Sequence, residues 1–331
     1  MGGGGRRRRA QRAATIAFAL AIGAASTAAA QGAGAARDDS LLSGKPTLEC
    51  QQPGAQLKTL GVAGGKDADV SRFPFIVYLQ IKNRNCGGTL VAPNGVVTAA
   101  HCVMPPPETC QYPVGDLNSG RCELQEPGDV TVFRPTRNGL VDVNQQRGVK
   151  RIFAHPKFRY SKQGGADSEP ALDADIAILV LDRPFDINTK DLATLADPSI
   201  NSNFAKGGEC ARVAGWGRTD VLADDLSVLQ EGRKTNKLQS INLRVVEQSR
   251  CVGKYGPLIT NNMMCVGDGI EGRNTCKGDS GGPLIVDVGK PMLVGVVSWA
   301  YGCAQKEHYT IFTRVGSREV RGWIDDLLNG R

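Results

Sequence analysis

The chain has 331 residues, of which 41% are hydrophobic and 22% are charged. This apolar content is sufficient for a packed core, which excludes a chain that is disordered throughout. The formal charge is +7, but residues 1–61 hold eight Lys and Arg against three Asp and Glu, which leaves 32 bases and 30 acids in the remainder. Because the basic excess belongs mainly to residues 1–61, we expect no nucleic-acid partner.

The first thirty residues have the pattern of an export signal. An arginine-rich start at residues 6–12 precedes an apolar stretch at 13–22 and a small-residue cleavage site at 28–30. The sequence therefore predicts a signal peptide over residues 1–30 and a secreted, extracellular protein. An uncleaved anchor, an organelle-targeting peptide and the twin-arginine route stay open as alternatives. No later stretch approaches eighteen consecutive apolar residues, so we expect no stable membrane insertion.

Ten cysteines fit an oxidising compartment, because an even number of cysteines in an exported chain indicates disulfides. A metal site is the alternative, but the chain contains no CxxC pair and only three histidines. We therefore predict disulfides. The cysteines are Cys50, Cys86, Cys102, Cys110, Cys122, Cys210, Cys251, Cys265, Cys276 and Cys303.

Residues 31–61 are rich in Gly, Ala, Gln and Ser without an apolar period, which is typical of a propeptide or linker. From Val62 onward the chain carries short apolar runs separated by Gly, Pro and Asn, a pattern that predicts a β-sandwich or β-barrel. The expected strands are residues 75–81, 95–98, 149–153, 176–181, 284–288 and 293–299.

Only the end of the chain has a helical pattern. Between residues 317 and 328, apolar side chains recur at spacings of three and four. The stretch 104–147 contains three consecutive prolines together with Cys110 and Cys122, and it is predicted to be a surface insertion closed by its own disulfide.

Three short segments carry the chemistry. They are residues 98–102 (TAAHC), residues 175–179 (DIAIL) and residues 276–283 (CKGDSGGP). Together they supply an imidazole base, a carboxylate and a hydroxyl nucleophile, since Ser280 needs His101 to take its proton during attack. Asp173 competes with Asp175 for the carboxylate role, but only Asp175 directly precedes the buried strand. We interpret His155 and His308 as structural or surface residues.

These segments resemble the chymotrypsin-like (trypsin-fold) family of serine endopeptidases. The resemblance covers about residues 62–331 and includes the motifs VAGG at 62–65, CGGTL at 86–90, HP at 155–156, GWG at 215–217 and SW at 298–299. It implies an all-β fold of two six-stranded antiparallel Greek-key β-barrels, with the site between them and a C-terminal α-helix. It also implies a triad of His101, Asp175 and Ser280, an oxyanion hole formed by the N–H groups of Gly278 and Ser280, and no cofactor.

The same resemblance implies a zymogen. Cleavage would free Val62, whose ammonium would pair with Asp279, and residues 31–61 would be the propeptide of a protease domain spanning 62–331. The family template implies the disulfides Cys86–Cys102, Cys251–Cys265 and Cys276–Cys303. Cys210 lies near a position where relatives carry a cysteine, but their usual partner position, near Val286, has none here, so we pair Cys210 with Cys50.

The specificity pocket departs from that of trypsin. Asn274 stands where trypsin-like relatives carry Asp, and Ala300 and Thr310 stand at two wall positions that are glycine in relatives with open pockets, while Ser298 and Trp299 complete the predicted substrate-binding residues. Without a carboxylate a basic P1 side chain would be buried uncompensated. We therefore expect a small or medium apolar P1 residue, with aromatic residues as the second possibility.

The activation junction departs as well, because residues 60–62 read LGV and no basic residue precedes Val62. No calcium loop can be located in residues 134–147, which lack Glu, so we predict no required metal. A catalytically silent homologue that acts as a binding or inhibitor module is the alternative function. A lipase or esterase would need its GxSxG motif on a strand-to-helix turn, which the all-β pattern of apolar runs disfavours. The expected partners are polypeptide substrates and protein inhibitors of proteases, and we expect a monomer.

Overall fold

The computed structural model describes residue 50 and residues 62–104, 124–161, 171–200, 206–218 and 236–328. The predicted signal peptide lies outside these residues, and so does the predicted propeptide apart from Cys50. Both cysteines of the predicted Cys110–Cys122 disulfide also lie outside them. No helix within the described part of the chain is long and apolar enough to cross a membrane.

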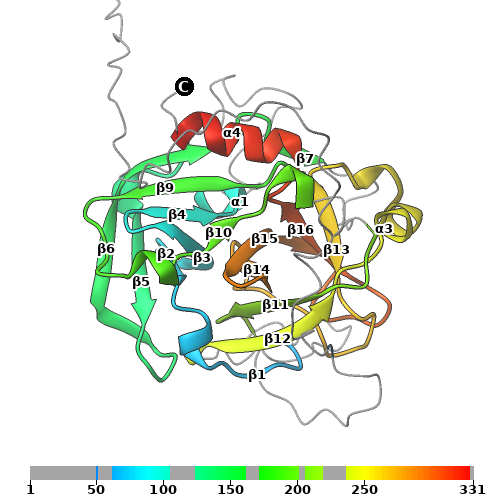
Figure 1. The fold of residues 1–331 in the computed structure, drawn as a ribbon, viewed down its shortest axis with the longest axis horizontal. Coiled ribbons are helices and arrows are strands. Elements are labelled where there is room, and N and C mark those ends of the chain that lie inside the picture. The colour runs from blue at the N-terminus through cyan, green and yellow to red at the C-terminus, as the bar shows by residue number, and fades with distance from the viewer. Residues whose placement is uncertain are drawn as a thin grey trace, which may run out of the picture.

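The first half of the fold is a closed antiparallel barrel of six strands (Figure 1). Around the barrel the order is β2-β3-β4-β9-β6-β5, so the strands follow the sequence order 1-2-3-6-5-4. All five residues of β9 are buried, as expected for the apolar run at 176–181. The strands are β2 (Ile76–Ile81), β3 (Arg84–Ala92), β4 (Gly95–Thr98), β5 (Val130–Pro135), β6 (Val141–Ala154) and β9 (Ala177–Leu181).

The second half repeats this order. Its strands run β12-β11-β14-β15-β16-β13, and an antiparallel bridge between Val245 and Val266 joins the ends of β12 and β13. Read around the ring, this is again 1-2-3-6-5-4, so the predicted all-β architecture of two six-stranded units is confirmed. The strands are β11 (Cys210–Gly215), β12 (Gln239–Arg244), β13 (Met263–Val266), β14 (Pro283–Asp287), β15 (Pro291–Ala300) and β16 (Thr310–Arg314).

Smaller elements join and extend the two barrels. A two-stranded sheet of β7 and β8 lies outside them, β1 pairs with β12, and β10 pairs with β15. These elements are β1 (Lys66–Asp67), β7 (Arg159–Ser161), β8 (Ala171–Asp173), β10 (Thr194–Leu195) and the 3₁₀ helices η2 (Val70–Arg72), η3 (Pro127–Asp129), η4 (Thr189–Asp191) and η6 (Gly256–Leu258).

The C-terminal helix α4 (Arg318–Leu328) confirms the helical pattern at the chain end (Figure 1). It buries Val320 and Ile324, and its Trp323 ring packs edge-on against His155 with 4.9 Å between ring centres. The His155 Nδ1 accepts a hydrogen bond from the Lys157 N–H at 3.2 Å, and burial lowers the pKa of this histidine. His155 is therefore a buried residue beneath α4.

Two expectations about local structure were wrong. The chain end is not the only helical segment, because α1 (Ala100–Val103) and α3 (Gln248–Tyr255) are also helices. Helix α3 buries only Cys251 and Tyr255, one turn apart, which is too sparse an apolar pattern to recognise in the sequence. The stretch 104–147 is not wholly a surface insertion, since β5 and the start of β6 lie in it and pair within the first barrel.

Candidate active site

His101 and Asp175 meet because the end of strand β4 pairs with the start of strand β9. Strand β4 leads into α1, which carries His101, and it pairs with β9 so that Thr98 lies opposite Ala177. The His101 Nδ1 lies 2.7 Å from Asp175 Oδ2, and the His101 backbone N–H donates to Asp175 Oδ1 at 2.9 Å. A carboxylate accepts hydrogen bonds, so Nδ1 carries the proton and Nε2 is left as the basic nitrogen.

Asp175 is fully buried and is bound by further hydroxyl groups from the second barrel. The Ser298 hydroxyl donates to its Oδ2 at 2.6 Å, and the Thr313 hydroxyl donates to its carbonyl oxygen at 2.7 Å. The Ser298 bond helps to compensate the desolvation of the buried carboxylate, and the Thr313 bond fixes the backbone of Asp175. Ser298 was predicted as a substrate-binding residue, and the structure gives its side chain this additional contact. Thr313 carried no signal in the sequence.

Asp173, the competing acid, is directed elsewhere. Its Oδ1 accepts hydrogen bonds from the Thr260 hydroxyl at 2.6 Å, from Asn262 Nδ2 at 3.2 Å and from the Ala174 N–H at 2.9 Å. Its carboxylate therefore fixes the loop before β13 in place. Only Asp175 of the two acids binds the His101 ring.

The loop that carries Ser280 is held against the first barrel by backbone contacts. The Gly87 N–H on β3 donates to the Ser280 carbonyl at 2.7 Å, and a Cβ on Gly87 would lie 2.8 Å from the Gly282 Cα. Gly278 and Gly281 have φ values of +101° and +76°, which side chains other than glycine rarely adopt. Glycines thus let the backbone of β3 and the backbone of the Ser280 loop come into direct contact.

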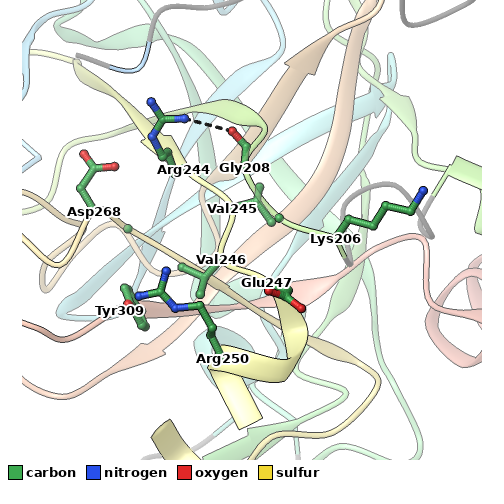
Figure 2. A pocket seen from close by; sticks show the side chains of 11 residues that line it. Lys206, Gly208, Arg244, Val245, Val246, Glu247, Arg250, Asp268 and Tyr309 are labelled. Carbon is green, nitrogen blue, oxygen red and sulfur yellow. Dashed lines mark hydrogen bonds between the residues drawn. The ribbon is translucent and has the colours of Figure 1, made fainter. Parts of the chain in front are cut away.

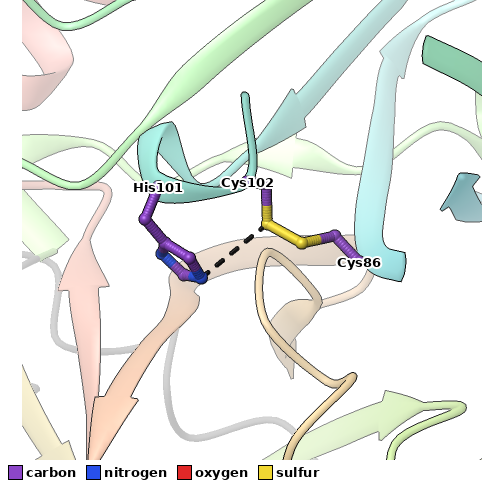
Figure 3. Close-up of side chains that lie close together, drawn as sticks. All are labelled: Cys86, His101 and Cys102. Carbon is purple, nitrogen blue, oxygen red and sulfur yellow. Dashed lines mark hydrogen bonds between the residues drawn. A yellow bond between two sulfur atoms is a disulfide. The ribbon is translucent and has the colours of Figure 1, made fainter. Parts of the chain in front are cut away.

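The Ser280 side chain is half-exposed. Among the described residues no hydrogen bond joins its hydroxyl to the His101 ring, whose Nε2 lies 3.9 Å from Cys102 Sγ (Figure 3). Such bonds are often long in a protein without substrate and tighten when substrate binds. The N–H groups of Gly278 and Ser280 have no hydrogen-bond acceptor within the described part of the chain.

Asp279 is completely buried beside Ser280. Its two oxygens accept hydrogen bonds from the N–H of Gly217 at 2.8 Å and of Cys276 at 3.0 Å. No basic side chain of the described residues pairs with it, and burial raises the pKa of this carboxyl to about 6. A side chain at Gly215 or Gly217 would overlap with the carboxylate, which explains the two glycines of the GWG motif.

The start of the predicted protease domain is buried against the second barrel in the uncleaved chain. Val62 and Ala63 are fully buried, and the Ala63 carbonyl accepts a hydrogen bond from the Asn274 N–H at 3.0 Å. Residue 63 therefore contacts the segment that carries the predicted floor of the specificity pocket.

The residues predicted to form that pocket lie together at the ends of β15 and β16. Ala300 is the cross-strand neighbour of Thr310, and Ser298 and Trp299 precede it on β15. The Thr310 hydroxyl donates to Asn274 Oδ1 at 2.7 Å, which also accepts from the Thr275 N–H at 2.9 Å.

Thr275 was not singled out from the sequence. Its hydroxyl lies 2.8 Å from that of Thr310, so the two threonines and Asn274 form one buried hydrogen-bonded group. Because a backbone N–H can only donate, the atom of Asn274 facing Thr275 is its oxygen, and this oxygen has both of its acceptor positions filled.

Four disulfides link the described residues, and no described cysteine is free. Cys86–Cys102 connects β3 to α1 beside His101, Cys251–Cys265 connects α3 to β13, and Cys276–Cys303 joins the two loops that flank the pocket. Cys50 is bonded to Cys210, so the segment that we predict to be a propeptide is tied to β11 at residue 50.

One group of potential metal ligands occurs next to the site. The ligand atoms of Cys86, His101 and Cys102 lie within 4.8 Å of one another (Figure 3). Both sulfur atoms belong to the disulfide and offer no thiolate, which is the form that binds a metal. This group therefore does not fit a metal ion.

His308 lies away from these residues, in an aromatic cluster. Its ring is 5.6 Å from that of Tyr301 and 6.5 Å from that of Tyr255, and the Tyr255 and Tyr301 rings are stacked at 5.6 Å. Desolvation lowers the pKa of His308. This histidine contacts neither Asp175 nor the loop of Ser280.

The two-barrel fold, with a histidine and a buried carboxylate on one side and a glycine-bounded serine loop on the other, is typical of serine endopeptidases. Residues 62–324 match the family model described as Trypsin. Trypsin of Squalus acanthias is 32% identical over 268 residues, which cover 81% of this chain and 96% of that protein. The vitellin-degrading protease of Bombyx mori is 30% identical over 285 residues, covering 85% and 90%. Coagulation factor IX of Oryctolagus cuniculus is 32% identical over 260 residues, covering 77% and 80%. The chain belongs to the trypsin family and is a serine endopeptidase.

Proposed function

We propose that the chain is made as a secreted zymogen whose mature form hydrolyses peptide bonds through Ser280, His101 and Asp175. The observation that carries this proposal is the pair of hydrogen bonds by which His101 holds the buried Asp175. They fix the proton on Nδ1 and leave Nε2 to act as the base. The four disulfides support an oxidising, extracellular destination.

The chemistry follows from these positions. The Ser280 Oγ attacks the scissile carbonyl carbon while His101 Nε2 takes its proton, and Asp175 stabilises the imidazolium without accepting that proton. The N–H groups of Gly278 and Ser280, which have no acceptor among the described residues, bind the developing oxyanion. The C–N bond then breaks, His101 protonates the leaving amine, and a Ser280 ester remains. Water, deprotonated by the same base, hydrolyses that ester.

Activation requires a cut before Val62. The new ammonium would enter the buried region around Asp279 and neutralise a carboxylate that has no cationic partner among the described residues. Residue 61 is Gly, so the activating cut is made by a non-tryptic protease, this enzyme included, or the end is trimmed afterwards. N-terminal sequencing of the secreted form tests this, and a first residue other than Val62 would refute the proposed switch.

The proposed specificity is for small or medium apolar P1 residues. The polar floor is neutral, because Asn274 has an uncharged amide where trypsin-like relatives carry Asp. Its oxygen already accepts hydrogen bonds from Thr275 and Thr310. Ala300 and Thr310 narrow the pocket by their side chains. A panel of chromogenic peptides that differ only at P1 tests the proposal. We expect faster cleavage after Ala, Val or Leu than after Arg, and the reverse order would overturn it.

Labelling with a fluorophosphonate probe tests the proposed nucleophile. The activated wild type should be labelled on Ser280, and Ser280→Ala should lose both the label and the peptidase activity. Ser249→Ala, an exposed serine on α3 whose hydroxyl binds Glu247, is the matched control and should keep both. A folded, correctly cleaved wild type that is neither labelled nor active would instead support the catalytically silent homologue.

A further inference from the structure

The segment that leads into Asn274 is a glycine-rich loop at residues 267–273. Gly267, Gly269 and Gly272 adopt positive φ values of +148°, +70° and +76°. Glycine restricts the backbone least of all residues, so this loop is not stiffened by its own side chains. It needs an external support if the pocket floor at Asn274 is to stay in place.

Packing does not supply that support on one side of the loop. A cavity of about 350 Å³ lies there, lined in part by Gly267, Asp268 and Tyr309 (Figure 2). Tyr309 directly precedes Thr310, so the cavity borders both segments that carry the pocket floor. Because this side of the loop faces an open hollow, polar contacts are the interactions available to hold the loop there.

A buried ion pair makes that contact. Asp268 Oδ2 lies 3.1 Å from Arg273 Nη2, and the side chains are only 9% and 5% exposed. The same Nη2 donates to the Asn242 carbonyl on β12 at 3.4 Å. The pair thus joins the two ends of the loop to each other and to a strand of the second barrel. Loss of either partner would leave a buried charge uncompensated.

The loop in turn supports its neighbours. The Gly269 carbonyl accepts a hydrogen bond from the Glu307 N–H at 2.9 Å, and the Gly272 N–H donates to the Ala304 carbonyl at 2.8 Å. These bonds tie the loop to the segment that ends at Thr310. A displacement of the loop would therefore move Asn274 and Thr310 relative to each other.

We propose that the Asp268–Arg273 ion pair positions the specificity pocket and so sets the P1 selectivity. Neither side chain contacts the substrate, and both act through the loop that carries Asn274. This inference rests on the proposed roles of Asn274 and Thr310 in P1 binding. The chemistry at Ser280 depends on other contacts, because Gly87 on the first barrel holds that residue.

Steady-state kinetics of the activated full-length enzyme, with peptide substrates bearing Val or Phe at P1, test the proposal. Asp268→Asn and Arg273→Gln should each raise KM for the Val substrate about tenfold and reduce the Val-to-Phe preference, while kcat changes less than about twofold. The double variant should be no worse than either single one, because the two residues act as a pair. Arg273→Lys keeps the charge and should show a smaller rise in KM.

A second ion pair with a buried arginine provides the control. Arg212 on β11 is as buried as Arg273 and pairs with Asp287 on β14, away from the pocket loops. Asp287→Asn should lower the melting temperature without altering KM or the P1 preference. If Asp268→Asn and Arg273→Gln lower the melting temperature but leave KM and the preference unchanged, the pair has only a stabilising role and the proposal is overturned.

Active-site titration separates this inference from the proposed mechanism. Variants that retain full fluorophosphonate labelling at Ser280 but show the shifted KM support a positioning role. If Asp268→Asn does not fold, Arg273→Gln decides the matter, since an unchanged KM in that folded variant would overturn the proposal. A folded wild type without a titratable serine would overturn the proposed mechanism itself, and this inference with it.

Discussion

The two barrels share one strand order but hold their functional groups in different ways. In the first barrel, His101 is held by side-chain chemistry, through two hydrogen bonds to a buried carboxylate. In the second barrel, Ser280 is held by backbone contacts that only glycines permit, at Gly281 and opposite Gly87. The first arrangement is therefore vulnerable to the loss of one polar atom, and the second is vulnerable to the gain of one methyl group.

Asp175→Asn should have the largest effect. The amide keeps the shape of the carboxylate, but its NH₂ group can donate to His101 and favour the wrong tautomer of the ring. The reference triad of this family loses about 10⁴-fold in kcat on this exchange, and we expect a similar loss here. Asp173→Asn, two residues away and bonded to Thr260 instead, is the control and should stay within a few-fold of wild type. Similar kcat values for the two variants would contradict the assignment of Asp175.

Gly281→Ala should have the next largest effect. The new Cβ would overlap with the Thr98 hydroxyl and the Gly87 carbonyl, and both are parts of the first barrel. The loop must then shift, and a displacement of about 1 Å at a reacting group can cost about 10²-fold in rate.

Gly289→Ala separates this overlap from backbone strain. Gly289 has nearly the same φ, +83° against +76°, but no atom lies within 4 Å of the position that its Cβ would take. It should therefore lose only about 1–2 kcal/mol of stability, the usual cost of a left-handed conformation, and keep its kcat. Equal losses of activity in the two variants would show that strain, and not contact between the barrels, sets the effect.

The sequence predicted the parts of this protein that have a local pattern. Apolar runs located six of the twelve barrel strands, and residues 95–98 match β4. Short motifs located His101, Asp175 and Ser280, whose neighbours in the chain are distinctive. Helix α3 escaped because its two buried residues form too weak a pattern.

Contacts between distant segments had no such pattern. The hydroxyl donors Ser298 and Thr313 reach Asp175 across more than 120 residues. Arg273 looks like a surface residue of a polar loop until the fold buries it beside Asp268 and under the Asn242 carbonyl. Such partners depend on how the two barrels are closed and joined, which no short stretch of sequence specifies.

Asp279 provides the last prediction, a pH dependence of stability in the uncleaved chain. Burial raises its pKa from 3.8 to about 6, so the folded chain binds this proton more tightly than the unfolded chain does. The resulting stabilisation is present below pH 3.8 and is lost as the pH rises through about 6. A shift of this size corresponds to about 3 kcal/mol at most.

Urea unfolding of the uncleaved Ser280→Ala precursor between pH 4 and 7 measures this change, with Asp279→Asn in the same background as the control. The stability of the precursor should fall with pH relative to that of the Asn variant, which has no carboxyl to titrate. After cleavage before Val62, the new ammonium should lower the pKa of Asp279 and remove the fall. A precursor and a cleaved form with the same dependence would show that the ammonium does not reach Asp279, because an ion pair formed in that buried position must change its titration.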